Sequence, residues 1–316
     1  MSALLESLNA RGPVLWLEIA PPRGVNAESL LSKLAMVRDQ IDAINLADNA
    51  LGRIKMSGLV FAAMVKARLA MAVVLNVSCR DRNRFALKSD LLGAAALGID
   101  AVVALQGDKL PSDGSAGARA VHDIDTFGLL RVIADLNRGD TGEGKRLLKT
   151  LPGLVAGAVA NPNRKELERE FDLLRRKAEA GARFVITQPV FEPEGARRFV
   201  ERARQHDLRV VLGILPVKRE SMANYLKQNI KDLSATHPHL DRYTGVAEEE
   251  VRRISLEQNL KLMDAVAGEV AGFNIMSGGG PSLAIELAQE WSQRRATAGI
   301  QPDREGKHHG SRPGSR

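Results

Sequence analysis

The sequence predicts a single (β/α)8 barrel, and three observations predict it. Short apolar, β-branched runs alternate with longer amphipathic segments from one end of the chain to the other, there are eight such runs, and their spacing is nearly constant. The length of 316 residues suits a barrel of about 250 residues or more with insertions. A doubly wound open sheet is the alternative, and the even spacing favours the barrel.

The expected strands are largely apolar and lack the period-two alternation of a half-exposed sheet, as buried parallel strands do. They are Val14–Ile19, Asp42–Leu46, Ala72–Val77, Ala101–Gln106, Gly153–Val159, Arg183–Gln188, Arg209–Ile214 and Val270–Ile275.

Helical patterns, with apolar residues at i, i+3 and i+4, lie between these strands. Gly98 and Gly181 stand where a helix C-cap needs glycine, and Pro281 suits the first turn of a final helix. The expected helices are Ser57–Ala70, Phe85–Leu97, Arg164–Ala180, Pro193–Gln205 and Ser282–Trp291, with two or three more within Lys218–Gly268, the last of them Glu248–Val266.

The sequence therefore predicts one barrel domain over residues 1–296, with extra helices between strands seven and eight. Residues 297–316 are rich in Gly, Arg, His and Ser and have no apolar period, so we expect a disordered basic tail there.

Composition excludes several classes of protein. Cys79 is the only cysteine, which rules out an intrachain disulfide, a Cys-rich zinc site and an iron–sulfur cluster. The six histidines show no metal-ligand spacing, and no metal is expected. No stretch approaches the ~20 apolar residues of a membrane helix, and no signal peptide is evident, so we expect a cytoplasmic protein.

The net charge of +7 comes from basic residues scattered among acidic ones, and aromatic residues make up only 4%. Nucleic-acid binders usually add a basic stripe with stacking aromatics, so we expect no nucleic-acid partner. A mildly basic protein suits an anionic small-molecule substrate, but this net charge is equally compatible with no charged partner. The sequence does not determine an oligomeric state.

Polar side chains stand where the expected strands end. Catalytic groups of parallel barrels come from these C-terminal ends, and buried polar groups without partners are costly. Such a ring is more often a small-molecule site than a stabilising device. Its members are Glu18, Asp48, Asn49, Asn76, Ser78, Gln106, Asp108, Asn161, Gln188, Asn274 and Ser277.

Glu18 is a lone carboxyl group in an apolar run, so its pKa should rise, and a carboxylic acid that stays protonated near neutral pH can act as a general acid. The alternative is an ion pair with Arg23 or another cation. Asp108 follows Gly107 at a strand end, where an ordinary turn or helix-capping role is an equal alternative.

Four segments, taken in order, resemble the methylenetetrahydrofolate reductase family, and the resemblance extends over roughly residues 14–295. They are Leu17–Arg23 with Glu18, Ala104–Asp108, Ile186–Pro189 with Gln188, and Gly213–Val217. Cys79–Asn83, Ser89–Ala94 and Asn161–Asn163 resemble its divergent bacterial branch.

The resemblance implies reduction of 5,10-methylenetetrahydrofolate to 5-methyltetrahydrofolate by NADH or NADPH. Glu18 would deliver a proton to N10, which opens the five-membered ring to an iminium ion at N5. Asp108 would stabilise that cation and engage the folate. Gln188 would hydrogen-bond the pterin edge, and we also expect Asn274 to contact the substrate.

The family normally carries FAD, and here the resemblance is incomplete. Ala47, Asn76, Gln106, Gly157 and Asn161 stand where the flavin site usually offers other side chains. Losing several donors, each contributing roughly 0.5–3 kcal/mol, could remove most of a cofactor's affinity. We therefore favour direct hydride transfer from NAD(P)H without tightly bound FAD. The residues expected around the cofactor are Asn76, Ser78, Gln106, Gly107, His122, Asn161, Arg176 and Lys177.

Two alternatives stay open. One is the usual FAD-dependent enzyme of the same family. The other is a non-catalytic folate-binding barrel that serves as a subunit of another oxidoreductase, although such a protein has no use for an acid in apolar surroundings.

Overall fold

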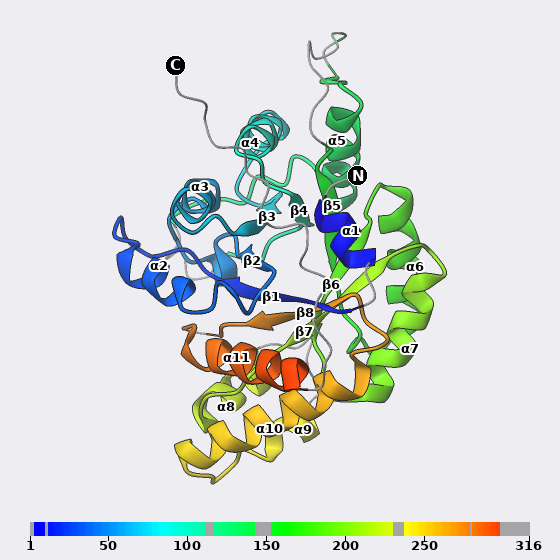
Figure 1. Cartoon of the computed structure of the whole chain (residues 1–316). Helices are drawn as coiled ribbons and strands as arrows, with labels where there is room; N and C mark the ends of the chain where they lie inside the picture. Colours follow the sequence, from blue (N-terminus) through cyan, green and yellow to red (C-terminus); the bar gives the residue numbers. More distant parts are fainter. Residues whose placement is uncertain are drawn as a thin grey trace.

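Parallel strands close into a barrel in the order in which they occur in the sequence (Figure 1). The structure is a computed structural model that describes residues 3–9, 12–110, 117–142, 144, 153–229, 237–278 and 280–297. Within these residues the strands are β1 (Val14–Ile19), β2 (Ala43–Leu46), β3 (Ala72–Ser78), β4 (Ala101–Leu105), β5 (Val155–Ala160), β6 (Phe184–Pro189), β7 (Arg209–Ile214) and β8 (Gly272–Met276). β8 pairs with β1 and closes the barrel.

Helices surround the barrel (Figure 1). They are α1 (Ala3–Asn9), α2 (Glu28–Ala35), the 3₁₀ turn η1 (Ala50–Gly52), α3 (Gly58–Leu69), α4 (Arg84–Ala96), α5 (Thr126–Asn137), α6 (Leu167–Glu179), α7 (Pro193–Arg204), α8 (Glu220–Asn229), α9 (His237–Asp241), α10 (Glu248–Val266) and α11 (Ser282–Thr297). The three helices α8 to α10 occupy the described part of the segment between β7 and β8, where the sequence predicts two or three.

Alternate residues of each strand face the barrel interior, because side chains of a strand point in turn to opposite faces. Trp16 and Phe184 fill the interior with their rings edge to face, 5.5 Å between centroids. Gly157 leaves room for Phe184, since a Cβ at residue 157 would lie 2.3 Å from its ring. The same alternation turns Glu18 and Gln188 inward, two and four residues beyond Trp16 and Phe184 and closer to the strands' C-terminal ends.

The strands predicted from the sequence are confirmed, with ends within about two residues of the expected positions. Gly98 and Gly181 adopt the left-handed conformation that ends a helix, with φ of 65° and 114°. Helices α1, α2 and α5 were not predicted, although α5 carries a clear apolar stripe and Asp125 caps it by accepting a hydrogen bond from the Gly128 amide. The expected tail, apart from Thr297 at the end of α11, lies outside the described residues.

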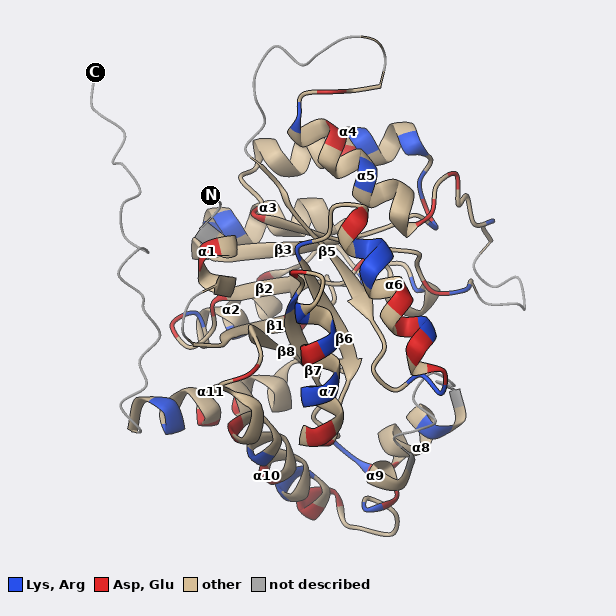
Figure 2. Ribbon diagram, turned by 90° about the vertical axis from the view of Figure 1, so that its right-hand side faces the viewer, with Lys and Arg blue, Asp and Glu red and all other residues tan. Residues whose placement is uncertain are grey.

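Charge is distributed evenly over the outer helices. Lys and Arg are interspersed with Asp and Glu along α6, α7 and α10 (Figure 2). Many of these side chains pair with each other, as Arg175 does with Asp172 and Glu179 on α6. None of the described helices is both long enough and apolar enough to cross a membrane.

Candidate active site

Glu18 faces the interior of the barrel one residue before β1 ends. Burial raises the pKa of Glu18 above the ordinary glutamate value, and a hydrogen bond from the Asn274 amide opposes part of that shift. Nδ2 of Asn274 lies 2.8 Å from Oε2 of the carboxyl group. Among the described residues no cation pairs with Glu18, so Arg23 is not its partner. The environment therefore favours the protonated acid.

Asn274 belongs to a chain of amides that runs across four neighbouring strands. Nδ2 of Asn76 on β3 donates to Oδ1 of Asn45 on β2 at 2.7 Å, and Nδ2 of Asn45 donates to Oδ1 of Asn274 on β8 at 3.1 Å. All three asparagines are buried, with at most 8% of their surface exposed. Their side chains bind one another and Glu18, which differs from the cofactor and substrate contacts expected of Asn76 and Asn274.

Gln188 is the polar side chain that β6 turns into the barrel. The pairing of β6 with β7 shifts register between Ile186 and Pro189, beside Gln188. Gln188 is half-buried, and the described residues offer its amide no hydrogen-bond partner. A half-buried amide without a partner is suited to recognise a ligand, because ligand binding would satisfy its donors and acceptor.

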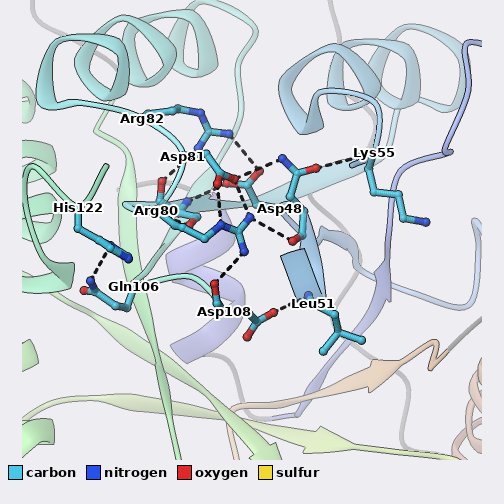
Figure 3. A network of polar contacts seen from close by, with 11 residues as sticks. Asp48, Leu51, Lys55, Arg80, Asp81, Arg82, Gln106, Asp108 and His122 are labelled. Atoms are coloured by element: carbon cyan, nitrogen blue, oxygen red, sulfur yellow. Dashed lines mark hydrogen bonds and ion pairs between the residues drawn. The ribbon is translucent and has the colours of Figure 1, made fainter. Parts of the chain in front are cut away.

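Arg80 ties together three of the loops at this end of the barrel (Figure 3). Its side chain is 2% exposed, and the guanidinium group binds both carboxylate oxygens of Asp81, at 2.6 and 2.7 Å. It also donates to the backbone oxygens of Asn49 and Asp108. Asp108 in turn accepts a hydrogen bond from the Leu51 amide at 2.6 Å and is exposed. The structure thus fixes the Asp108 carboxylate at the rim through one of its oxygens.

A second ion pair fixes the end of β3. Both carboxylate oxygens of Asp48 accept from Arg82, at 2.8 and 3.0 Å, and Asp48 also accepts from the Ser78 amide. The Ser78 hydroxyl accepts a hydrogen bond from the Arg80 amide. Ser78 is fully buried, so its hydroxyl holds the loop and does not present itself to a cofactor.

Gly107 brings the β4 end close to the β3 end. Its φ is 88°, and a Cβ at residue 107 would lie 2.2 Å from the Ser78 hydroxyl and 2.7 Å from Cβ of Arg80. On either side of it, Gln106 and Asp108 are exposed. The Gln106 amide lies 2.8 Å from Nδ1 of His122, itself at a positive φ of 45° (Figure 3). The structure therefore brings Gln106, Gly107, Asp108 and His122 together.

Lys177 and Asn161 make their hydrogen bonds within the segment formed by β5, the loop after it and α6. Lys177 donates to the backbone oxygen of Val159 at 2.8 Å and pairs with Glu170, which is 1% exposed. Glu170 also binds Arg164 and accepts a hydrogen bond from the backbone N–H of Asn161. The Asn161 side chain accepts from the Asn163 amide within the same loop. This cluster clamps the β5–α6 loop. Burial lowers the pKa of Lys177, and the Glu170 carboxylate opposes part of that shift.

Arg176 does not join the other expected cofactor residues. Its guanidinium carbon lies 4.4 Å from the ring centroid of Phe127 on α5, so it forms a cation–π contact between two outer helices. No group of three or more His, Cys, Asp and Glu side chains in the described ranges could hold a metal ion. The Cys79 thiol is buried, which raises its pKa to about 11 and leaves it a poor nucleophile.

The sequence matches the family model of methylenetetrahydrofolate reductase over residues 4–275. The chain belongs to the methylenetetrahydrofolate reductase family. It is 26% identical to the 5,10-methylenetetrahydrofolate reductase of Salmonella typhimurium and 24% identical to that of Escherichia coli, each over 212 residues. These matches cover 65% of this chain and 65% of each relative.

Solved structures share the fold. An uncharacterized protein from Clostridium thermocellum, described as binding two copies of 5-methyl-5,6,7,8-tetrahydrofolic acid, superposes with a TM-score of 0.61 at 16% identity, covering 94% of this chain and 100% of that one. The long-chain alkane monooxygenase LadA superposes with a TM-score of 0.51 at 13% identity, covering 91% and 92%. Because the second protein is named for a different activity, the barrel alone does not decide function.

The family usually carries FAD, and most of the side chains expected around a cofactor are engaged within the protein. Of the eight residues expected around a cofactor, four have side chains bound to other side chains or to the backbone, and Arg176 lies between outer helices. The four are Asn76, Ser78, Asn161 and Lys177. Gln106, Gly107 and His122 are left at the rim. A flavin bound by side-chain donors would find few of them free.

Sequence reasoning missed Asn45 and the roles of Arg80, Asp81 and Arg82. Asn45 follows Ala43 by two residues on β2, so strand alternation alone marks it as inward-facing. Arg80 to Arg82 follow β3 directly, and this arginine-rich turn after a buried strand was a signal of a charge network. Their partners on the neighbouring loops could not be read from the sequence.

Proposed function

We propose that this protein reduces 5,10-methylenetetrahydrofolate to 5-methyltetrahydrofolate, with NADH or NADPH as the hydride donor. The observation that carries the proposal is an inward-facing Glu18 at the end of β1, whose pKa is raised by burial and which has no ion-pair partner among the described residues. An unpaired acid at the catalytic end of a barrel suits proton transfer to a substrate. Membership of the reductase family supplies the substrate class.

Glu18 acts as the general acid. The five-membered ring of the substrate opens when N10 takes a proton, the bond between N10 and the bridging carbon breaks, and a cationic iminium forms at N5. Hydride addition to the bridging carbon then produces the N5-methyl group. One hydride and one proton enter the product, and Glu18 regains its proton from solvent.

Asp108 and Gln188 hold the substrate. The second oxygen of the Asp108 carboxylate makes no hydrogen bond in the described part of the chain, and its negative charge stabilises the iminium cation. The free amide of Gln188 binds the pterin edge and fixes its orientation. Arg80 keeps Asp108 in place through the Asp108 backbone oxygen.

Hydride transfer is direct, without tightly bound FAD. Support comes from the side chains that would have to recognise a flavin, because most of those expected to do so are engaged within the protein. Gln106 and His122, exposed and joined at the rim, are the expected residues still able to contact a nicotinamide dinucleotide.

The test uses the purified protein with no added flavin. Its visible spectrum is recorded, and oxidation of NADH and of NADPH is followed with and without 5,10-methylenetetrahydrofolate. We expect no flavin absorbance and a folate-dependent oxidation of at least one nucleotide. A tightly bound yellow chromophore would overturn the direct transfer and favour the FAD-dependent enzyme. Folate binding without oxidation of either nucleotide would favour the non-catalytic barrel.

A further inference from the structure

The asparagine chain beneath Glu18 has a fixed direction. Nδ2 of Asn76 donates to the backbone oxygen of Leu46 at 2.7 Å as well as to Oδ1 of Asn45. A backbone oxygen can only accept, so the end of Asn76 that faces Leu46 must be its NH₂ group. The amide orientation that is ordinarily ambiguous for asparagine is settled here by a main-chain atom.

This direction passes from one amide to the next. Because Asn76 presents its NH₂ group, Asn45 must present its oxygen to Asn76 and its own NH₂ group to Asn274. Asn274 must then turn its oxygen toward Asn45 and its NH₂ group toward Glu18. The last hydrogen bond of the chain ends on Oε2 of Glu18, which has to accept it.

We propose that Asn76, Asn45 and Asn274 are positioning residues that reserve Oε2 of Glu18 as an acceptor and thereby confine the acidic proton to Oε1. This inference rests on the proposed role of Glu18. Oε1 has no hydrogen-bond partner in the described residues and is not among their buried, unpartnered polar atoms, so it keeps contact with solvent. The chain therefore aims the proton away from the barrel interior and toward the open end.

Amides suit this task better than charged side chains. A lysine or arginine in place of Asn274 would fix the carboxyl group equally well, but its charge would hold Glu18 ionised and remove the acid. A neutral amide orients the carboxyl group while burial still raises the pKa. Three neutral residues in series also avoid the cost of a buried charge.

Charged groups near Glu18 leave this arrangement undisturbed. Those at neighbouring strand ends, apart from Arg23, are bound to each other or to backbone groups, and none of the described ones counts among the causes that shift the pKa of Glu18. The charged groups at these strand ends are Arg23 after β1, Asp48 after β2, Arg80, Asp81 and Arg82 after β3, Asp108 after β4, and Lys218 after β7.

The first test replaces the middle of the chain. Asn45→Leu keeps the approximate shape of the side chain but frees the Asn274 amide to turn over, which would place the proton on Oε2. We expect the kcat of Asn45→Leu to fall by about 10- to 100-fold, part of the 10²–10⁴ that a general acid supplies. KM for the folate should change by less than about twofold, and the kcat–pH profile should shift to higher pH.

Asn259→Leu is the matched control. Asn259 is also a buried asparagine, on α10, and donates to the backbone oxygen of Ser255. Its loss should lower stability but leave the kcat–pH profile in place. If Asn45→Leu only lowers stability in the same way and keeps the wild-type profile, the chain has a structural role and the proposal is overturned.

A second measurement needs neither turnover nor a variant. In the wild-type protein labelled with ¹³C and ¹⁵N, the Glu18 carboxyl signal is titrated while the side-chain NH₂ signals of the three asparagines are followed. We expect the Asn274 and Asn45 signals to shift with the Glu18 midpoint. If the Asn274 and Asn45 signals do not respond to the titration of Glu18, the proposal is overturned. Because no substrate is present, this result is independent of whether the protein reduces folate.

Discussion

Burial destabilises the ionised form of Glu18. Glu18 lies between apolar neighbours in β1, and its one described hydrogen-bond donor is a neutral amide. The cost of ionising it falls on the folded protein alone, since the unfolded chain hydrates the carboxylate. A carboxyl group kept for proton transfer therefore lowers the free energy of unfolding, a trade-off typical of active sites.

The pH dependence of stability tests this burden. Because the pKa of Glu18 is raised in the folded state, its contribution to the free energy of unfolding is full at acidic pH and is lost as pH rises through the folded pKa. We expect Glu18→Gln to gain stability over the wild type as the pH becomes alkaline. Urea denaturation of both proteins at several pH values measures the difference, and a difference independent of pH would contradict the raised pKa.

Gly107 is a second residue whose identity the site requires. Gly107→Ala would meet the Ser78 hydroxyl and Cβ of Arg80 at a left-handed φ, so we expect a loss of at least about 2 kcal/mol of unfolding free energy. Gly195→Ala is the control, because Gly195 lies in α7 with open space around it, and we expect a gain of about 0.5–1 kcal/mol. Denaturant titration gives both values, and equal effects would refute the close approach.

The loops after β2, β3 and β4 behave as one unit because Arg80 joins them. Arg80→Met would leave the Asp108 backbone oxygen without its donor and would remove the Arg80 hydrogen bonds from the Asn49 backbone oxygen and the Asp81 carboxylate. We expect a loss of about 3 kcal/mol or more in unfolding free energy and a higher KM for the folate, since Asp108 loses its support. Arg68→Met, which removes an exposed ion pair with Glu28, should leave both quantities unchanged. A wild-type KM for the folate in Arg80→Met would show that Arg80 does not position Asp108 for substrate binding.

The β5–α6 loop is held by a different set of contacts, those of Arg164 and Lys177 with the buried Glu170. Lys177→Met leaves the Glu170 carboxylate with less compensation, and we expect a loss of about 3 kcal/mol in unfolding free energy. KM for the nicotinamide nucleotide should stay at the wild-type value, because Lys177 faces α6 and β5. A large rise in the KM for the nicotinamide nucleotide, with stability retained, would instead indicate that Lys177 contacts the cofactor.

The barrel as a whole could be predicted from the sequence because each strand is a compact apolar run. Val14–Ile19 and Arg209–Ile214 are found with the expected ends. α2 was missed because it is short and buries only Leu31 and Leu34, which leaves a weak pattern. Hydrophobic periodicity identifies helices and strands that bury a wide apolar face, and it does not identify elements that bury only a few side chains.

The site was predictable only up to the identity of the inward-facing residues. Strand ends indicated Glu18, Asp108 and Gln188 without any contact being known. The asparagine chain could not be predicted, because Asn274 and Glu18 are 256 residues apart and meet only when β8 closes on β1. Likewise, whether Asn76 faces a ligand or another amide depends on the register of β2 and β3.

The central claim is that Glu18 delivers the proton that opens the folate ring. It is tested most directly by the folate-dependent oxidation of NADH and NADPH in the wild type and in Glu18→Gln, with folate binding measured in parallel. We predict that Glu18→Gln binds folate within severalfold of the wild type but turns over about 10²–10⁴ times more slowly. Wild-type turnover in Glu18→Gln would contradict the account.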